Sequence, residues 1–175
     1  MMNLSFALGE RAKLQKAVIL MGSKSDMEFC ERIRSSLSSY SIESDLRIAS
    51  AHRTPEYLLK LIREYSSSGD EIVAITVAGL SDALSGVVAA QRLFPVIACP
   101  PDIEKYELMK VFSSAFTPSD VPVAFVNDPT KAANLAAQIF ALTNSDLKHR
   151  ISKMTNEKRT QLEKMDSEMV QKSAS

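Results

Sequence analysis

Three short polar segments carry the residue types that could do chemistry, and each one directly follows an extended or apolar stretch. The first is residues 22–26 (GSKSD), the second is residues 50–55 (SAHRTP), and the third is residues 78–86 (AGLSDALSG). In a parallel sheet covered by helices, ligands bind outside the carboxyl ends of the strands. If each of these segments follows a strand of such a sheet, they meet at one edge. We therefore interpret the three segments as the walls of one small-molecule site.

The second segment contains the candidate acid/base group. The imidazole of His52 can take and give a proton near neutral pH, and the planar guanidinium of Arg53 suits a phosphate. A histidine beside a phosphate clamp is a plausible proton-transfer centre. A lone histidine is also often structural, and that alternative stays open. The other histidine, His149, falls in a charged C-terminal segment and is expected to be solvated.

The first segment is typical of a turn between a strand and a helix. Gly22 lets the backbone approach a ligand, and the hydroxyls of Ser23 and Ser25 could donate to a phosphate or a ribose. The carboxylate of Asp26 could accept from ribose hydroxyls or a ring amine. An equally good interpretation is that Ser25 or Asp26 only caps the following helix. The spacing matches neither a P-loop nor the Rossmann GxGxxG pattern.

The third segment is small enough for its backbone to line a flat ring, with Gly79 and Ser81 as candidate contacts. Asp82 is in the right place to cap the helix that follows. Neither metal-ligand spacing nor a GxSxG nucleophile pattern occurs in the sequence, so we predict no metal and no cofactor.

Strands and helices alternate along the chain. The pattern predicts strands at about 16–21, 44–50, 71–77, 95–99 and 122–126, with helices beginning at 25–26 and 54–55 and spanning 82–93, 103–115 and 129–142. Thr54 is expected to cap the second helix, with proline at its first position. This order predicts an α/β fold, a three-layer α/β/α arrangement with a parallel, flavodoxin-like sheet.

The two ends of the chain differ from this body. We expect residues 1–15 to form an N-terminal arm, residues 16–143 to form the α/β catalytic domain, and residues 144–175 to form a C-terminal helical extension. Apolar residues recur at helical spacing along the extension, interrupted by Lys158; they are Leu147, Ile151, Met154, Leu162, Met165 and Met169. This helix packs either on its own domain or on another subunit, and the sequence does not separate the two.

Composition excludes several classes of protein. Of 175 residues, 45% are hydrophobic and 24% charged, and the 21 basic residues balance the 21 acidic ones. This balance indicates no nucleic-acid partner. No apolar run reaches the roughly 18 residues of a membrane span, and no secretory signal is evident, so we expect a cytoplasmic protein. Cys30 and Cys99 are expected to be buried and reduced.

The first two segments, in this order, resemble the signature loops of the phosphoribosylaminoimidazole carboxylase family. That family contains carboxylases of 5-aminoimidazole ribonucleotide (AIR) and mutases of N5-carboxyaminoimidazole ribonucleotide. The resemblance spans about residues 16–143. It implies a purine-biosynthesis enzyme whose partners are a small ribonucleotide substrate and carbon dioxide. It also implies a homo-octamer with sites between subunits.

The third segment separates the two classes of that family. In the mutase class, this segment resembles AG-x-AAHLPG. This chain has Ala83 in place of the histidine of that pattern and Ser85 in place of its proline. In the carboxylase class, the same segment resembles AGRSN-x-L-S/G. This chain departs from that pattern at Leu80 and at Asp82. Arg53, by contrast, resembles the mutase class. We therefore favour direct carboxylation of AIR, with the mutase and a non-catalytic nucleotide-binding homologue as alternatives.

The resemblance also implies a role for each candidate residue. His52 is the proton-transfer residue, and Arg53 contacts the phosphate. The remaining substrate-binding candidates are Gly22, Ser23, Ser25, Asp26, Ser50, Ala51, Gly79 and Ser81. A receiver or flavin module is a further alternative, but it would need an acidic cluster or a stacking aromatic at the strand ends. Asp26 stands alone there and the chain has no tryptophan.

Overall fold

The computed structural model describes residues 13–173, without the side chains of residues 106–108 and 173. Its centre is one sheet of five parallel strands in the order β2-β1-β3-β4-β5. The strands are β1 (Gln15–Met21), β2 (Glu43–Ile48), β3 (Glu71–Val77), β4 (Val96–Ala98) and β5 (Ala124–Phe125). This strand order is the flavodoxin-like one, so the predicted fold class is confirmed.

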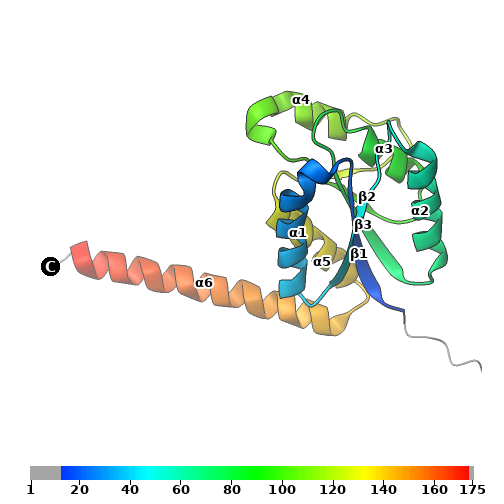
Figure 1. The fold of residues 1–175 in the computed structure, drawn as a ribbon. Coiled ribbons are helices and arrows are strands. Elements are labelled where there is room, and N and C mark those ends of the chain that lie inside the picture. Colours follow the sequence, from blue (N-terminus) through cyan, green and yellow to red (C-terminus); the bar gives the residue numbers. More distant parts are fainter. Residues whose placement is uncertain (1–12, 174–175) are drawn as a thin grey trace, which may run out of the picture.

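Helices cover both faces of the sheet (Figure 1). The helices are α1 (Met27–Ser39), α2 (Pro55–Ser67), α3 (Ala83–Ala90), α4 (Ile103–Ala115), α5 (Pro129–Phe140) and α6 (Ser145–Ser173), with a short 3₁₀ turn η1 (Lys24–Asp26) before α1. Helices α1 and α5 pack on one face of the sheet, and α2 and α3 pack on the other. Helix α4 lies near the end of the sheet where the strands finish (Figure 1).

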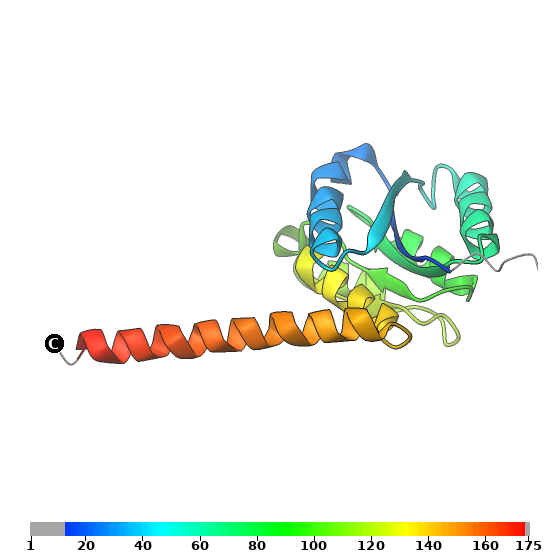
Figure 2. The same ribbon diagram turned by 90° about the horizontal axis from the view of Figure 1, so that it is seen from below.

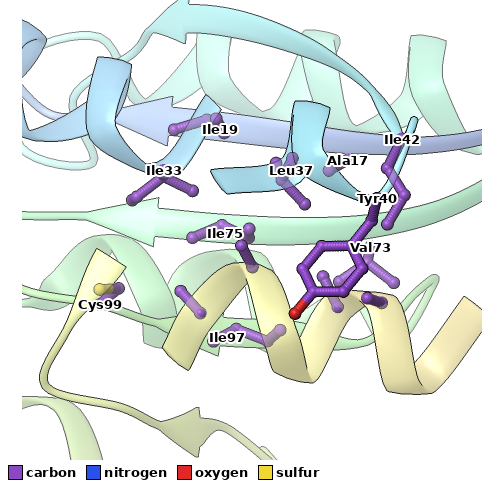
Figure 3. Packing of buried hydrophobic residues seen from close by; sticks show 14 of the residues in the cluster. Ala17, Ile19, Ile33, Leu37, Tyr40, Ile42, Val73, Ile75, Ile97 and Cys99 are labelled. Carbon is purple, nitrogen blue, oxygen red and sulfur yellow. The ribbon is translucent and has the colours of Figure 1, made fainter. Parts of the chain in front are cut away.

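Alternation along the central strands builds two apolar layers. In β1, Ile19 faces α1 and α5, whereas Val18 and Leu20 face α2 and α3. The apolar layer between the sheet and helices α1 and α5, called the first layer below, is shown in Figure 3. In this view Ile33 and Leu37 of α1 lie over the strands. Burying one such side chain stabilises the fold by roughly 1.5–3 kcal/mol, so these layers fix the register that aligns the strand ends.

Both cysteines are free and buried in the first layer, as predicted. Burial is the main cause that raises the pKa of the Cys30 thiol and of the Cys99 thiol to about 12. Both groups are therefore uncharged at neutral pH.

Most element bounds agree with the sequence pattern, and the differences have local causes. The helix predicted over 82–93 ends at Ala90, because Arg92 adopts a left-handed conformation with φ 54°. The second strand stops at Ile48 rather than at residue 50, because the Ser50 N–H is already bonded to Thr54 in the turn that follows. The fifth strand is two residues long instead of five. The expected arm lies outside the described residues as far as residue 12, and Gln15 is already in β1.

Helix α6 has two parts with different surroundings. Near its start, Leu147 is buried, and Ile151 and Met154 pack against the first apolar layer. The Arg150 guanidinium also donates to the backbone carbonyl of Tyr40 at 2.6 Å. The rest of the helix extends away from the body (Figures 1 and 2) and exposes its apolar residues Leu162, Met165, Met169 and Val170. None of the helices among residues 13–173 is long and apolar enough to cross a membrane.

Candidate active site

The three polar segments meet in one pocket of about 400 Å³ beyond the carboxyl ends of β1, β2 and β3. Its lining includes every residue that was predicted from the sequence to belong to the site. The lining residues are Gly22, Ser23, Ser25, Asp26, Ser50, Ala51, His52, Arg53, Ala78, Gly79, Leu80, Ser81 and Leu84. The expectation that the segments share one edge of the sheet is therefore confirmed, while the roles of the individual residues stay predictions.

The turn that carries His52 and Arg53 is closed by hydrogen bonds within itself. The Ser50 N–H donates to Thr54 Oγ1 at 2.9 Å, and the Thr54 N–H donates to the Ser50 carbonyl at 2.9 Å. The Arg53 N–H donates to Ser50 Oγ at 3.2 Å. Thr54 is at the N-cap position of α2 and proline follows it, as predicted, but the Thr54 side chain makes no capping bond to α2 and closes this turn instead. The turn presents His52 and Arg53 as exposed side chains at the pocket.

The turn of residues 22–26 leaves its carboxylate available to the pocket. Ser23 Oγ accepts from the Ser25 N–H at 3.3 Å and from the Ser25 hydroxyl at 2.9 Å, so Ser23 caps the 3₁₀ turn. Asp26 precedes α1 but makes no side-chain capping bond. Asp26 therefore occupies the N-cap position of α1, but neither its side chain nor that of Ser25 makes a capping bond to this helix. The Gly22 N–H donates to the Val77 carbonyl at 3.0 Å, which ties this turn to the end of β3, directly before the third segment.

Burial is the main cause that raises the pKa of the half-buried Asp26 carboxyl above its ordinary value. A hydrogen bond from the Ser25 hydroxyl and the positive charge of Lys110 both oppose this rise in pKa, and the negative charge of Asp102 adds to it. The pocket thus contains one carboxylate whose charge depends on its neighbours.

Asp82 faces the protein interior rather than the pocket. Its buried carboxylate accepts from the Ser85 N–H at 3.0 Å, from the Ser85 hydroxyl at 2.5 Å and from the Ser114 hydroxyl at 2.6 Å. The predicted cap of α3 by Asp82 is confirmed. Asp82 is also absent from the pocket lining, whereas its neighbours Leu80 and Ser81 are part of it.

Lys110 is a residue of this region that the sequence analysis did not find. It comes from α4, is only 2% exposed, and donates to the backbone carbonyls of Ala78, at 3.0 Å, and of Gly79. A signal was present in the sequence, since Lys110 and Ser114 are spaced four residues apart and share one face of a helix. Nothing in that pattern indicated that the lysine would point at a loop more than thirty residues earlier.

The arrangement suits a phosphorylated small molecule. The wall formed by residues 50–53 presents the cationic Arg53 with His52 beside it, and the turn of residues 22–26 presents hydroxyls and the Asp26 carboxylate. An anion, a sugar and a flat ring would each find matching groups in this pocket. The described residues include no group of three or more histidine, cysteine or acidic side chains placed to hold a metal ion.

Comparison with known proteins gives a consistent result. The model of the AIR carboxylase family matches residues 16–161. A phosphoribosylaminoimidazole carboxylase of Archaeoglobus fulgidus is 42% identical over 159 residues, covering 91% of this chain and 87% of the relative. The human bifunctional phosphoribosylaminoimidazole carboxylase/phosphoribosylaminoimidazole succinocarboxamide synthetase is 38% identical over 129 residues, covering 74% of this chain and 30% of that longer protein.

The fold is likewise similar to solved structures. The crystal structure of Treponema denticola PurE2-S38D superposes with a TM-score of 0.84 at 35% identity, covering 87% of this chain and 96% of that one. The crystal structure of Treponema denticola PurE gives a TM-score of 0.83 over 87% of this chain and 97% of that one.

Proposed function

Because the chain belongs to the AIR carboxylase family, we propose that it carboxylates AIR with carbon dioxide to 4-carboxy-5-aminoimidazole ribonucleotide in purine biosynthesis. The observation that carries this proposal is the single pocket in which His52, Arg53 and Asp26 come together from two different loops. A protein that had lost the chemistry would have no need to hold the histidine and the arginine in a turn closed by four hydrogen bonds.

Each wall of the pocket has a part in binding the ribonucleotide. Arg53 binds the phosphate, and its exposed position lets the guanidinium approach two phosphate oxygens. Ser23 and Asp26 bind the ribose, since an ionised carboxylate accepts hydrogen bonds from hydroxyls. The remaining contacts with the substrate come from Gly22, Ser25, Ser50, Ala51, Gly79 and Ser81.

The reaction needs one new bond and one proton transfer. Carbon 4 of the aminoimidazole is an enamine-like nucleophile that attacks the carbon of carbon dioxide, forming a C–C bond and a carboxylate. The tetrahedral carbon 4 then loses its proton, which restores the aromatic ring. His52 lines the pocket and is the group that takes this proton.

The third segment supports direct carboxylation over the mutase reaction. Ala83, which stands where the mutase class has histidine, begins α3 and is absent from the pocket lining. Asp82 makes its contacts with Ser85 and Ser114, so its charge is directed away from the incoming carboxylate. With alanine at position 83, His52 is the histidine that lines the pocket.

An exposed apolar surface near the pocket supports assembly. Leu80 is 70% exposed at the pocket. Helix α4 exposes Met109 and Phe112, and Phe116 directly after α4 is exposed as well, with the two aromatic rings 5.1 Å apart. Several exposed large apolar side chains of this kind are often covered by a partner. We propose that further copies of the chain cover them, in a homo-octamer whose pockets lie between subunits.

Turnover of two substrates under matched conditions tests the reaction. One assay supplies AIR with bicarbonate and dissolved carbon dioxide, and the other supplies N5-carboxyaminoimidazole ribonucleotide in buffer depleted of carbon dioxide. Faster use of AIR supports the proposal, and faster use of the carbamate makes the protein a mutase. Binding of AIR without turnover of either substrate would favour the non-catalytic alternative.

A further inference from the structure

We propose that Lys110 is a positioning residue that supplies, from behind the loop of residues 78–82, the positive charge needed by the nucleotide-binding wall of the pocket. The inference rests on the proposed function for the identity of the nucleotide. Its geometric basis is independent of the reaction, because it consists of the hydrogen bonds from Lys110 to the backbone of this loop.

Helix α4 holds this loop at both ends. Near the start of the loop, the Lys110 ammonium donates to the carbonyls of Ala78 and Gly79. At the other end, the Asp82 N–H donates to Ser113 Oγ at 2.7 Å, and the Asp82 carboxylate accepts from the Ser114 hydroxyl at 2.6 Å. The shape of the third pocket wall therefore depends on a helix that contributes no residue to the pocket lining.

Lys110 is a single cation with several acidic side chains around it. Burial lowers the pKa of Lys110, and the carboxylates of Asp102, Asp82 and Asp26 act in the opposite direction. Lys110 is thus a nearly buried cation facing three acids. Leu80 and Ser81, which the same loop exposes at the pocket, carry no charge. Lys110 consequently provides positive charge to this wall from its inner side.

Asp26 is the pocket group that this charge affects. The carboxylate lies next to the Gly79 backbone, whose carbonyl accepts from Lys110. The ionisable groups that act on Asp26 or line its pocket are Lys110 on α4, Asp102 before α4, Cys30 on α1, and His52 and Arg53 across the pocket. Removing Lys110 takes away the cation that favours the ionised form of Asp26, and it leaves two carbonyls without this donor.

Three single variants separate a positioning role from a merely structural one. Lys110→Met removes the charge, Lys110→Arg keeps it, and Lys60→Met removes an exposed lysine of α2 as a matched control. For each variant we would measure kcat and KM for AIR across pH, and would follow the Asp26 carboxyl by ¹³C NMR titration. The kcat/KM profile reports ionisations of the free enzyme, so it can be compared directly with the titration.

We expect Lys110→Met to raise KM for AIR by about 10-fold to 100-fold, with a much smaller change in kcat. The Asp26 titration and the acid limb of kcat/KM should both move to higher pH. Lys110→Arg should restore most of the affinity, and Lys60→Met should behave as wild type. A merely structural role would lower the melting temperature of Lys110→Met and leave the Asp26 titration in place.

The same measurements also decide the role of Lys110 if Lys110→Met does not fold or if wild type is inactive. If Lys110→Met does not fold, the double variant Lys110→Met/Asp82→Asn removes a buried base and a buried acid together, and the same Asp26 titration is measured on it. If wild type turns over neither substrate, the proposed reaction is wrong, while the titration still decides the role of Lys110. An Asp26 titration unchanged by loss of Lys110 would overturn the inference.

Discussion

The Asp26 carboxylate lies against the backbone of Gly79, so that a Cβ added at Gly79 would stand 3.3 Å from Asp26 Oδ1. These two residues come from the first and the third polar segments, more than fifty positions apart in the sequence. Their contact joins two walls of the pocket. It also leaves Asp26 little room to move, which makes Gly79 a sensitive position for binding.

Gly79→Ala should weaken binding of the ribonucleotide with little loss of stability. The new methyl group displaces the Asp26 side chain by a few tenths of an ångström, and we expect KM for AIR to rise about 10-fold. Gly86→Ala is the matched control: its Cβ would only touch Thr117 Cγ2 at 4.0 Å, and Gly86 lies inside α3. This control should keep the wild-type KM and gain about 0.5–1 kcal/mol of stability. Equal KM values for both variants would contradict the proposed part of Asp26 in binding.

His52→Asn should preserve binding and remove turnover. Asparagine keeps a polar side chain at the tip of the turn but cannot exchange a proton near neutral pH. We expect kcat for AIR to fall by about 10²–10⁴-fold, with the Kd for AIR nearly unchanged by calorimetry. His149→Asn, at an exposed position of α6, should behave as wild type. Full activity of His52→Asn would mean that another group moves the proton.

Asp26→Asn should make the ligand-free protein more stable at neutral pH. The pKa of Asp26 in the folded protein is raised, so folding favours the protonated carboxyl, and this stabilisation is lost as pH rises through the raised pKa. Above that pH, wild type carries the cost of a partly desolvated charge, which asparagine does not have. Chemical denaturation across pH should therefore show the variant ahead at pH 7 and level with wild type below about pH 4. A less stable variant at pH 7 would show that the charged form is the favoured one.

The two parts of α6 should respond differently to the same truncation. Leu147 is buried against the body, so Leu147→Ala should cost about 2–5 kcal/mol of stability. Leu162 is 67% exposed, and Leu162→Ala should change stability by less than about 0.5 kcal/mol in a monomer. Denaturation should be repeated at several protein concentrations. A concentration-dependent loss for Leu162→Ala would show that the outer part of α6 is buried in an assembly.

The layers of this fold could be predicted from sequence because burial on two faces leaves a plain pattern. The run Ile72–Val77 is apolar except for Thr76, as expected of a strand covered on both sides, and the polar segments after such runs mark the ends of strands. The end of α3 was harder to predict. A left-handed conformation at Arg92 ends it, and arginine gives no sign of that conformation in sequence.

The three segments that line the pocket could be predicted from the sequence, but the tertiary contacts that support them could not. The cap by Asp82 could be predicted, because this residue acts on the helix that directly follows it in the sequence. Lys110 acts over a contact between residues 31 apart, and Thr54 closes a turn where its position suggested a cap. Tertiary hydrogen bonds of this kind depend on how helices are placed on the sheet, which local spacing does not encode.

The closed turn of residues 50–54 has a kinetic consequence. Its four hydrogen bonds form during folding, so the loop that carries His52 and Arg53 is already ordered when a ligand arrives. A phosphorylated ligand meets its cation without waiting for that segment to rearrange. Association at this wall should then follow a single exponential whose rate rises linearly with ligand concentration and falls as ionic strength increases.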